Sequence, residues 1–433
     1  MAQEPSYRDR SVLIHGKFRS EKWDFQDHIT PPITTAVTFR LRSAERGAAG
    51  FQQFANPAIN RDTATPIYIY ERLDEPCSGM LEENLAFAER GETAVVFATG
   101  MAAIAAAIGI HVRQGDHIVM PPAIYGCTYS HVVNWLPRFG ITHTLANFQS
   151  EDDLRAAIRP ETRVVYFETP TNPTMELIDL EMVARVVAEV NASRPESERV
   201  VSIVDNTFAS PFGQRPLTHG IDFVVHSLTK HIGGFGTNMG GVVIGPRRAE
   251  TDLLLYRKDF GGSIAPDTAW HVSVYGLPTL PHRLEVQQRN AALVADYLAQ
   301  HPAVAQVWYP GRADFPQREL AERQMRDYDG NFAPGSMLFF SLQGSLEESY
   351  AAAMRVSNHI AAHALSVTLA VSLGQIKTLI EHPASMTHSA ISPEVQMQGG
   401  ILPGGLRLSV GLEDPRDIIA DLERALAQAT APA

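Results

Sequence analysis

Short apolar runs alternate with helical stretches over residues 78–270, and this alternation constrains the fold more than any other feature. Strands are predicted near Ala94–Ala98, His117–Met120, Val164–Glu168, Val200–Asp205, Phe223–His226 and Val242–Ile244. Helices are predicted between them, for example at Met80–Glu89 and Met101–Ile110. Strands that alternate with helices form a mostly parallel sheet with helices on both faces. The sequence therefore predicts an α/β fold.

The pattern changes near residue 271, where we expect a second domain to begin. The predicted elements there are helix Leu284–Ala299, strand Val304–Tyr309, a polar loop through Asn331, strand Met337–Leu342 and helix Leu346–Ala362. We expect a large domain at residues 66–270 and a smaller C-terminal α/β domain at residues 271–433. Residues 1–65 hold many turn formers, such as Pro31-Pro32 and Asn56-Pro57. We expect them to form an arm that contacts a neighbouring subunit.

Composition excludes several classes of partner and location. The net charge of −12 argues against nucleic acid or an anionic membrane as a partner. Two cysteines do not make a disulfide framework and suit a reducing cytoplasm. The polar N-terminus lacks the apolar stretch of a signal peptide, and no run reaches about 18 apolar residues. The 16 histidines include no H-E-x-x-H motif, so no metal site is predicted.

Lys230 follows the apolar run that ends near Val225, within the segment His226-Ser227-Leu228-Thr229-Lys230-His231-Ile232-Gly233-Gly234. A desolvated lysine can form a Schiff base with a carbonyl, and the nearby hydroxyls and glycines can hold a phosphate. Ser227 and Thr229 are expected to share one strand face, so both hydroxyls could point at one anion. Asp205 ends another apolar run, and ligands bind where parallel strands end in an open sheet. A carboxylate there would keep a pyridine nitrogen protonated. The pair predicts pyridoxal phosphate (PLP) as cofactor.

Three further residues fit this interpretation, each with a plainer alternative. Gly100 and Met101 stand at a predicted helix N-terminus, whose free N–H groups favour a phosphate. Many strand–glycine–helix turns bind nothing, however. Tyr125 follows a strand end and could lie on a flat ring, or simply pack in the core.

Taken together, the motifs resemble those of the Cys/Met-metabolism family of PLP enzymes, which includes methionine γ-lyase, cystathionine γ-synthase and the O-acylhomoserine sulfhydrylases. The resemblance runs from about Thr30 to the C-terminus. Its motifs occur in order as Tyr70-Glu71-Arg72, Thr99-Gly100-Met101, Tyr125-Gly126-Cys127, Glu168-Thr169-Pro170-Thr171-Asn172-Pro173, Val204-Asp205-Asn206-Thr207, Ser227-Leu228-Thr229-Lys230, His382-Pro383-Ala384-Ser385-Met386-Thr387-His388 and Arg407-Leu408-Ser409-Val410-Gly411.

The resemblance implies a PLP-dependent transferase-like fold (fold type I) and assigns roles around the cofactor. Lys230 would hold PLP as a Schiff base, and Asp205 would pair with the pyridinium nitrogen. Tyr125 would stack on the ring and act as acid or base toward the leaving group. The phosphate would be bound by Gly100, Met101, Ser227 and Thr229.

The resemblance also implies a substrate site and an assembly. Arg407 would hold the substrate α-carboxylate in bidentate fashion. Asn172 and Ser372 would assist near the cofactor and the carboxylate. Tyr70 and Arg72 would complete the phosphate site of the neighbouring subunit. The active unit would therefore be at least a dimer, and usually a homotetramer.

Several residues bear on which reaction the chain catalyses. Cys127, two residues after Tyr125, and the pair Lys258-Asp259 resemble methionine γ-lyase. Cys127 could instead be a small buried residue, and the pair a solvated one. The glycine-rich loop at residues 233–241 resembles the sulfhydrylases more closely, with Phe235 where a histidine is usual. The sequence therefore predicts a γ-lyase, with γ-replacement as the alternative.

Acidic residues after the first motif suggest one particular substrate. Glu71, Asp74 and Glu75 would lie near the neighbour's active-site mouth and suit a cationic leaving group. The hypothesis is a guanidinooxy amino acid such as canavanine. The alternative is that these carboxylates are solvated or pair with Arg61 and Arg72.

A dinucleotide-binding loop at Gly234, Gly236 and Gly240 is a weaker interpretation. That fingerprint places its glycines directly after the first strand, whereas these follow a Ser-Leu-Thr-Lys run.

Overall fold

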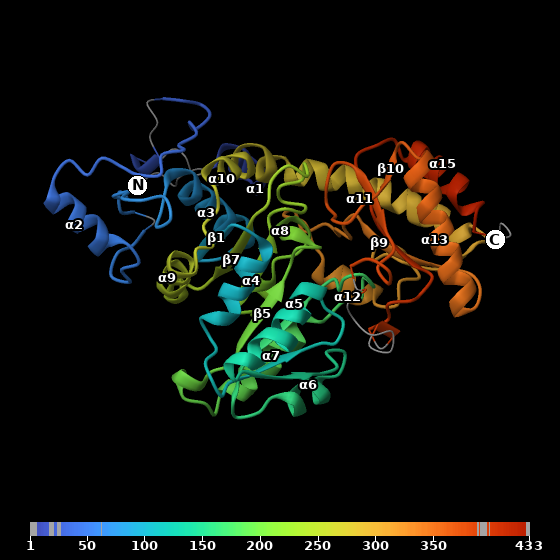
Figure 1. Cartoon of the computed structure of the whole chain (residues 1–433), viewed down its shortest axis with the longest axis horizontal. Coiled ribbons are helices and arrows are strands. Elements are labelled where there is room, and N and C mark those ends of the chain that lie inside the picture. The colour runs from blue at the N-terminus through green and yellow to red at the C-terminus, as the bar shows by residue number, and fades with distance from the viewer. Residues whose placement is uncertain are drawn as a thin grey trace.

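The computed structural model describes residues 7–16, 21–23, 27–61, 63–387, 389, 396–397 and 399–429. Two α/β units lie along the long axis of the molecule, and the helix α11 (Leu277–Gln300) runs from one to the other (Figure 1). No helix within these ranges is long and apolar enough to cross a membrane.

The large unit is built on a seven-stranded sheet with the order β1-β7-β6-β5-β4-β2-β3. Its strands are β1 (Thr93–Phe97), β2 (His117–Met120), β3 (Thr142–Leu145), β4 (Thr162–Glu168), β5 (Val201–Asp205), β6 (Phe223–Ser227) and β7 (Gly241–Gly245). The strands from β6 to β3 pair in parallel, and β7 is antiparallel to both of its neighbours. The predicted mostly parallel sheet is confirmed.

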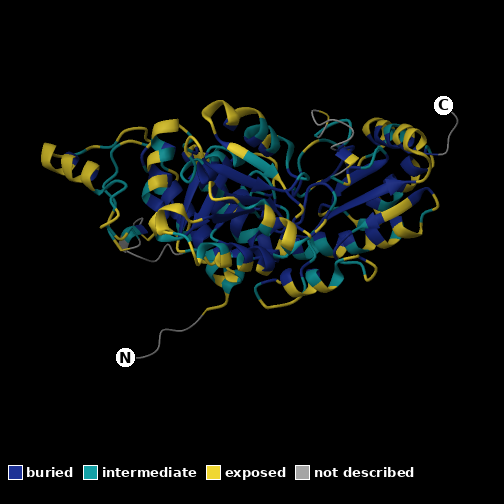
Figure 2. Ribbon diagram, turned by 90° about the horizontal axis from the view of Figure 1, so that it is seen from below, coloured by how far each residue is buried: buried dark blue, intermediate teal, exposed yellow. Residues whose placement is uncertain are grey.

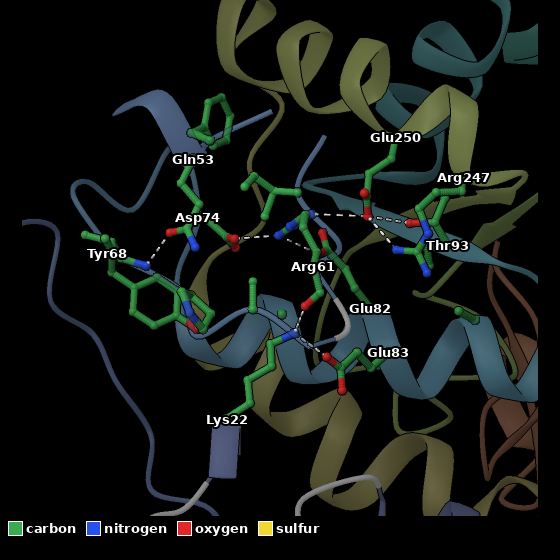
Figure 3. A pocket seen from close by; sticks show the side chains of 18 of the residues that line it. Lys22, Gln53, Arg61, Tyr68, Asp74, Glu82, Glu83, Thr93, Arg247 and Glu250 are labelled. Atoms are coloured by element: carbon green, nitrogen blue, oxygen red, sulfur yellow. Dashed lines mark hydrogen bonds and ion pairs between the residues drawn. The ribbon is translucent and has the colours of Figure 1, made fainter. Parts of the chain in front are cut away.

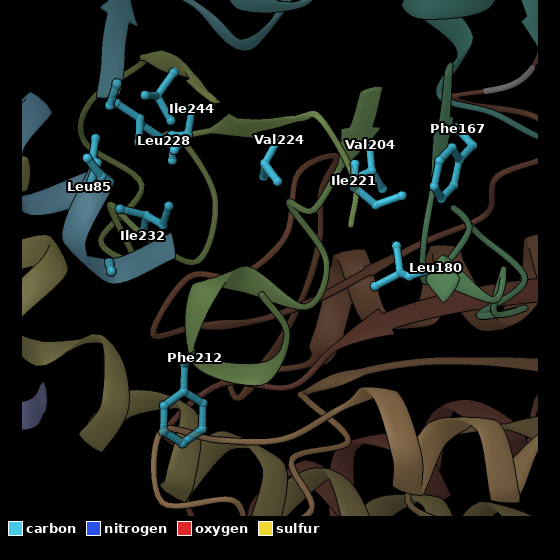
Figure 4. Packing of buried hydrophobic residues seen from close by; sticks show 14 of the residues in the cluster. Leu85, Phe167, Leu180, Val204, Phe212, Ile221, Val224, Leu228, Ile232 and Ile244 are labelled. Atoms are coloured by element: carbon cyan, nitrogen blue, oxygen red, sulfur yellow. The ribbon is translucent and has the colours of Figure 1, made fainter. Parts of the chain in front are cut away.

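Alternate residues of each strand except β3 enter two separate hydrophobic cores, one on each face of the sheet. Val224 belongs to the same core as Leu85 and Leu180 on one face (Figure 4), whereas Val225 shares a core with Ile104 and Leu253 on the other. Full burial of such a side chain contributes about 1.5–3 kcal/mol. Strands buried on both faces become continuous apolar runs, and this is why the runs were visible in the sequence.

Helices cover both faces. The face with Val224 is covered by α3 (Pro76–Glu89) and α7 (Leu180–Asn191), and the opposite face by α4 (Gly100–Gly109) and α9 (Glu250–Phe260). The remaining helices of this unit are α5 (Gly126–Ser130), α6 (Glu151–Ala157), α8 (Ser210–Gly213) and α10 (Pro266–His271).

The C-terminal unit has a five-stranded sheet with the order β10-β11-β12-β9-β8, in which only β10 and β11 are parallel. Its elements are β8 (Val304–Trp308), α12 (Arg318–Gln324), β9 (Met337–Leu342), α13 (Leu346–His363), β10 (Val367–Leu369), β11 (Thr378–Glu381), β12 (Gly405–Ser409) and α15 (Pro415–Leu426). A hydrophobic core forms between this sheet and α11, α13 and α15. The two buried sheets stand out in Figure 2. Helix α12 corrects the prediction of a polar loop through Asn331.

The N-terminal segment is more structured than expected. It contains α1 (Asp9–His15) and α2 (Ala44–Gln53). Helix α1 packs against α11 and α3 of its own chain, and Arg10 forms an ion pair with Glu285. Helix α2 stands away from the body and is mostly exposed (Figures 1 and 2). Contact of this segment with a neighbouring subunit stays a prediction.

Arg61 ties this segment to the large unit beside a cavity of about 70 Å³ (Figure 3). Its guanidinium lies 2.5 Å from the carboxylate of Asp74, 3.7 Å from Glu82 and 3.5 Å from Glu250. A partly buried arginine surrounded by carboxylates needs them as counter-ions. Asp74 is therefore committed to its own chain.

Candidate active site

The ends of β5 and β6 meet through a short chain of hydrogen bonds. The backbone N–H of Thr207 donates to the Asp205 carboxylate at 2.9 Å, and the N–H of Ser227 donates to the Thr207 hydroxyl at 2.9 Å. Burial raises the pKa of Asp205. A buried carboxylate with a raised pKa is best held ionised by a cation placed beside it.

The start of α4 approaches Ser227 closely enough to form an anion cradle. A Cβ atom at Gly100 would lie 2.9 Å from the Ser227 Cβ and 3.1 Å from its Oγ. Only glycine therefore lets the helix come this near the hydroxyl. Thr99 caps the helix by accepting from the N–H of Ala102 at 3.0 Å, and the first helical N–H groups, those of Gly100 and Met101, lack intrahelical partners. Such a terminus attracts a phosphate.

Thr229 departs from the prediction. Strand β6 ends at Ser227, so Thr229 lies in the following turn and does not share a strand face with Ser227. Its hydroxyl accepts from the N–H of Gly240 at 3.2 Å. Binding of the phosphate by its side chain stays a prediction.

Lys230 lies in the same turn with its amine largely removed from water. Its Nζ donates to the Ser372 hydroxyl at 2.9 Å. Burial, followed by repulsion from Arg407, lowers the pKa of the amine to about 8. Ser372 has a φ of +99°, a conformation that costs non-glycine residues energy and clusters at functional sites.

Arg407 on β12 brings the predicted substrate residues together. It is 3% exposed, and it donates to the Asn172 side-chain oxygen at 2.8 Å and to the Ser372 carbonyl at 2.9 Å. Ser372 therefore contacts both Lys230 and Arg407. The structure places the predicted carboxylate anchor and the predicted Schiff-base lysine against the same residue, one on its carbonyl and one on its hydroxyl.

Tyr125 and Cys127 lie together at the start of α5. Burial, and then a side-chain hydrogen bond with Cys127, raise the pKa of the Tyr125 phenol. Cys127 is exposed, so its alternative interpretation as a small buried residue is wrong. The Tyr125 phenol stays protonated at neutral pH and can donate a proton.

Glu168 is a site residue to which the sequence reasoning gave no role. Its carboxylate accepts from the backbone N–H of Tyr125 at 3.1 Å and from that of Asn172 at 2.9 Å. Glu168 is the register partner of Asp205, and burial together with this neighbour raises its pKa to about 8. The available signal was a carboxylate at the end of a buried strand, the same signal that identified Asp205.

Tyr70 and Arg72 lie apart from this group. Arg72 donates to the carbonyl of Lys258 at 2.7 Å, and its own carbonyl accepts from Ser263 at 3.0 Å. Tyr70 forms a β-bridge with Thr38. Within the described ranges, no hydrogen bond or ion pair joins either residue to Lys230. Their contribution to a neighbour's site stays a prediction.

Asp74 and Glu75 have partners within their own chain, and this corrects their predicted orientation toward a substrate; for Glu71 that orientation stays a prediction. Glu75 is 1% exposed and caps α3, accepting from the N–H groups of Cys77 at 2.7 Å and Ser78 at 2.5 Å. Asp74 pairs with Arg61, as the alternative interpretation held.

The glycine-rich loop lies beside the turn of Lys230. Phe235 is 39% exposed, and the Arg283 guanidinium lies 5.5 Å from the centre of its ring. Phe235, Thr229 and Tyr275 line a cavity of about 290 Å³. Lys258 forms its ion pair with Asp259 at 3.1 Å. His388, the last residue of its motif, lies outside the described residues.

The residues present fit PLP. Lys230 supplies an amine with a lowered pKa for the aldehyde, and Asp205 supplies a buried carboxylate for the ring nitrogen. The start of α4 beside Ser227 supplies a cradle for the phosphate, which a Cβ at Gly100 would fill. These are the three anchors that the cofactor needs.

Comparison with known proteins also indicates a PLP-dependent enzyme. A sequence model described as "Cys/Met metabolism PLP-dependent enzyme" matches residues 10–427. L-methionine gamma-lyase of Porphyromonas gingivalis is 41% identical over 400 residues, which cover 92% of each chain. Cystathionine gamma-synthase of Mycobacterium bovis is 34% identical over 403 residues, covering 92% of this chain and 97% of that protein.

The solved structures agree. Cystathionine gamma-lyase from Lactobacillus plantarum, crystallised with L-serine, superposes with a TM-score of 0.83 at 32% identity. The match covers 98% of this chain and 100% of that one. The architecture is that of fold type I, and the chain belongs to the Cys/Met metabolism family of PLP-dependent enzymes.

Proposed function

We propose that this enzyme is a γ-lyase that eliminates the γ-substituent of a methionine-type L-amino acid. The observation that carries the proposal is the protonated Tyr125 phenol, whose backbone is held by Glu168, the same carboxylate that holds Asn172 beside Arg407. This arrangement supplies a proton donor near the predicted carboxylate anchor. The similarity to L-methionine gamma-lyase of Porphyromonas gingivalis supports the same reaction.

Arg407 would bind and orient the substrate. Its guanidinium is fixed by Asn172 and Ser372, so it offers a carboxylate a preorganised partner. A fixed anchor and an amine that both contact Ser372 would hold the α-carbon near Lys230.

Lys230 would accept the protons that leave the α- and β-carbons. Bound PLP would supply an electron sink that makes these carbons acidic. An amine with a pKa of about 8 is well suited to take up and release protons near neutral pH. Its hydrogen bond to Ser372 holds the amine against the residue that Arg407 also contacts.

Tyr125 would protonate the leaving sulfur. Its raised pKa keeps the phenol protonated until a basic thiolate forms. Glu168 would hold the backbone of Tyr125 and that of Asn172 at a fixed separation. The acid and the carboxylate site would thus keep one geometry.

Replacement of the γ-substituent is the second candidate. The similarity to cystathionine gamma-synthase of Mycobacterium bovis supports it, and so does the resemblance of the glycine-rich loop to that of the sulfhydrylases. A γ-replacement enzyme would give no thioether product until sulfide or cysteine is added. The electrostatic argument for canavanine is reduced to Glu71, because Asp74 and Glu75 are engaged within the chain.

The test is a substrate panel. Purified enzyme is mixed with methionine, canavanine, cystathionine and O-acetylhomoserine, with and without sulfide, while 2-oxo acid, ammonia and thioether are followed. We expect 2-oxo acid from methionine without added thiol. Lys230→Ala should abolish it, whereas Lys377→Ala, at an exposed lysine, should not. If a thioether forms only with sulfide and methionine gives no 2-oxo acid, the enzyme catalyses γ-replacement and the proposed γ-elimination is refuted.

We also propose that the active unit is a homo-oligomer, a homotetramer arranged as a dimer of dimers, whose active sites take Tyr70 and Arg72 from a neighbour. The exposure of Arg72 and of α2 supports this. Co-expression of Lys230→Ala chains with Arg72→Ala chains should restore activity to mixed assemblies, because one site per pair is then intact. Sedimentation gives the number of subunits. Activity of a monomer would contradict the proposal.

A further inference from the structure

Arg407 already has a carboxylate partner inside the protein. Glu381 on β11 is its register partner across the sheet, and its Oε1 lies 3.0 Å from the Arg407 Nη1. Glu381 is 1% exposed and Arg407 is 3% exposed. The Thr387 hydroxyl donates to the same Oε1 at 2.9 Å. Within the described part of the chain, nothing donates to the Oε2 of Glu381.

This pair has two physical consequences. A buried arginine needs a counter-ion, and Glu381 supplies it before any substrate arrives. An arriving α-carboxylate must then share one guanidinium with a second buried carboxylate, and like charges at such short range repel each other. The unsatisfied Oε2 leaves part of the Glu381 charge uncompensated by hydrogen bonds, which adds to that repulsion.

We propose that Glu381 determines how strongly Arg407 holds the substrate α-carboxylate, by acting as its resident counter-ion and weakening that grip. The inference rests on the proposed role of Arg407. The carboxylate is retained from substrate to product, so Glu381 acts on both alike. It lowers affinity and favours release, and it leaves the bond-breaking step unchanged.

The experiment measures the binding of glycine, which has an α-carboxylate and no γ-substituent. Binding to the PLP-loaded enzyme is followed by the change in its visible absorbance. Glu381→Gln should bind glycine about tenfold more tightly than the wild type. Glu381→Asp keeps the charge and should stay within about twofold. Glycinamide lacks the carboxylate charge, so the wild type and both Glu381 variants should bind it with equal affinity.

A double-mutant cycle links the effect to Arg407. Arg407→Ala should weaken glycine binding, and adding Glu381→Gln in that background should change nothing further. Glu413→Gln is the matched control, because Glu413 accepts from Thr378 in the same sheet, away from Arg407. It should leave glycine affinity unaltered.

Three results would overturn the inference. These are unchanged or weaker glycine binding by Glu381→Gln, an equal gain for glycinamide, and persistence of the gain without Arg407. If Glu381→Gln does not fold, Glu381→Met removes the charge with an apolar side chain and should likewise bind glycine more tightly than the wild type. Glycine binding needs no γ-elimination. An enzyme that binds glycine through Arg407 but does not cleave methionine would therefore refute the proposed γ-elimination and leave the inference about Glu381 standing.

Discussion

The amine of Lys230 should behave as a neutral nucleophile near neutral pH in enzyme freed of PLP. Its pKa is lowered from 10.5 to about 8. At pH 7 an amine with a pKa of about 8 is about 9% neutral, whereas an ordinary lysine is about 0.03% neutral. The difference is about 300-fold in reactive amine.

Competitive acylation measures this directly. Cofactor-free enzyme is pulsed with a trace of an amine-selective acylating reagent from pH 6 to pH 11, and the Lys230 peptide is quantified by mass spectrometry. The midpoint should lie near pH 8 in the native enzyme, and near pH 10.5 for the same peptide in denatured chain. The denatured sample controls for the reagent.

Two substitutions separate the causes of the lowered Lys230 pKa. Burial is the largest cause, so it should keep the acylation midpoint below that of the denatured chain in both variants. Arg407→Ala should raise the midpoint by removing a positive charge, and Asp205→Asn should lower it by removing a negative one. A native midpoint at or above pH 10 would refute the reasoning about the Lys230 environment.

Four other predictions follow from named contacts. Gly100→Ala places a Cβ 2.9 Å from the Cβ of Ser227 and should weaken PLP binding at least about tenfold, measured by fluorescence titration; unaltered affinity would contradict the cradle. Tyr125→Phe should retain exchange of the methionine α-proton into D₂O, seen by NMR, while 2-oxo acid formation falls at least about 100-fold. Glu75→Ala should lower the free energy of unfolding of the cofactor-free chain by about 1–2 kcal/mol in denaturant titration, because the α3 cap is lost. Burial raises the pKa of Glu168 from 4.5 to about 8, so the wild type binds more protons when folded and loses stability as pH rises between these values. The cofactor-free Glu168→Gln variant should therefore gain in Tm relative to the wild type from pH 5 to pH 8.5, and a constant difference would contradict the shift.

The sheet was predictable because its strands are buried on both faces and stand out as apolar runs. Strand β3 was missed for the opposite reason. Its residues, Thr142–Leu145, form a partly exposed edge strand without such a run. Helix α12 was missed because its seven residues are mostly polar.

The site was predictable where chemistry coincides with a strand end. Asp205 and Lys230 could be found in this way, whereas Ser372 and Arg407 were assigned only through the family resemblance. Lys230 and Ser372 are 142 residues apart in sequence, and no local pattern links them. Glu381 directly follows the apolar pair Leu379-Ile380 at the end of β11, and its position in the sequence gave no sign of its cross-strand partner.

The acidic cluster shows a different failure. Glu75 stands directly before Pro76, a combination typical of a helix N-cap followed by proline at the first helical position. Its charge was read as a binding feature when its position indicated a cap. Asp74 was correctly paired with Arg61 only in the alternative interpretation.

The most direct test of the account is the location of the covalent link to PLP. The chain has five lysines, at positions 17, 22, 230, 258 and 377. The PLP-loaded enzyme is reduced with borohydride, digested, and searched by mass spectrometry for phosphopyridoxyl-lysine. The account predicts this adduct on Lys230. An adduct on another lysine, or none in an enzyme that retains its visible cofactor band, would contradict it.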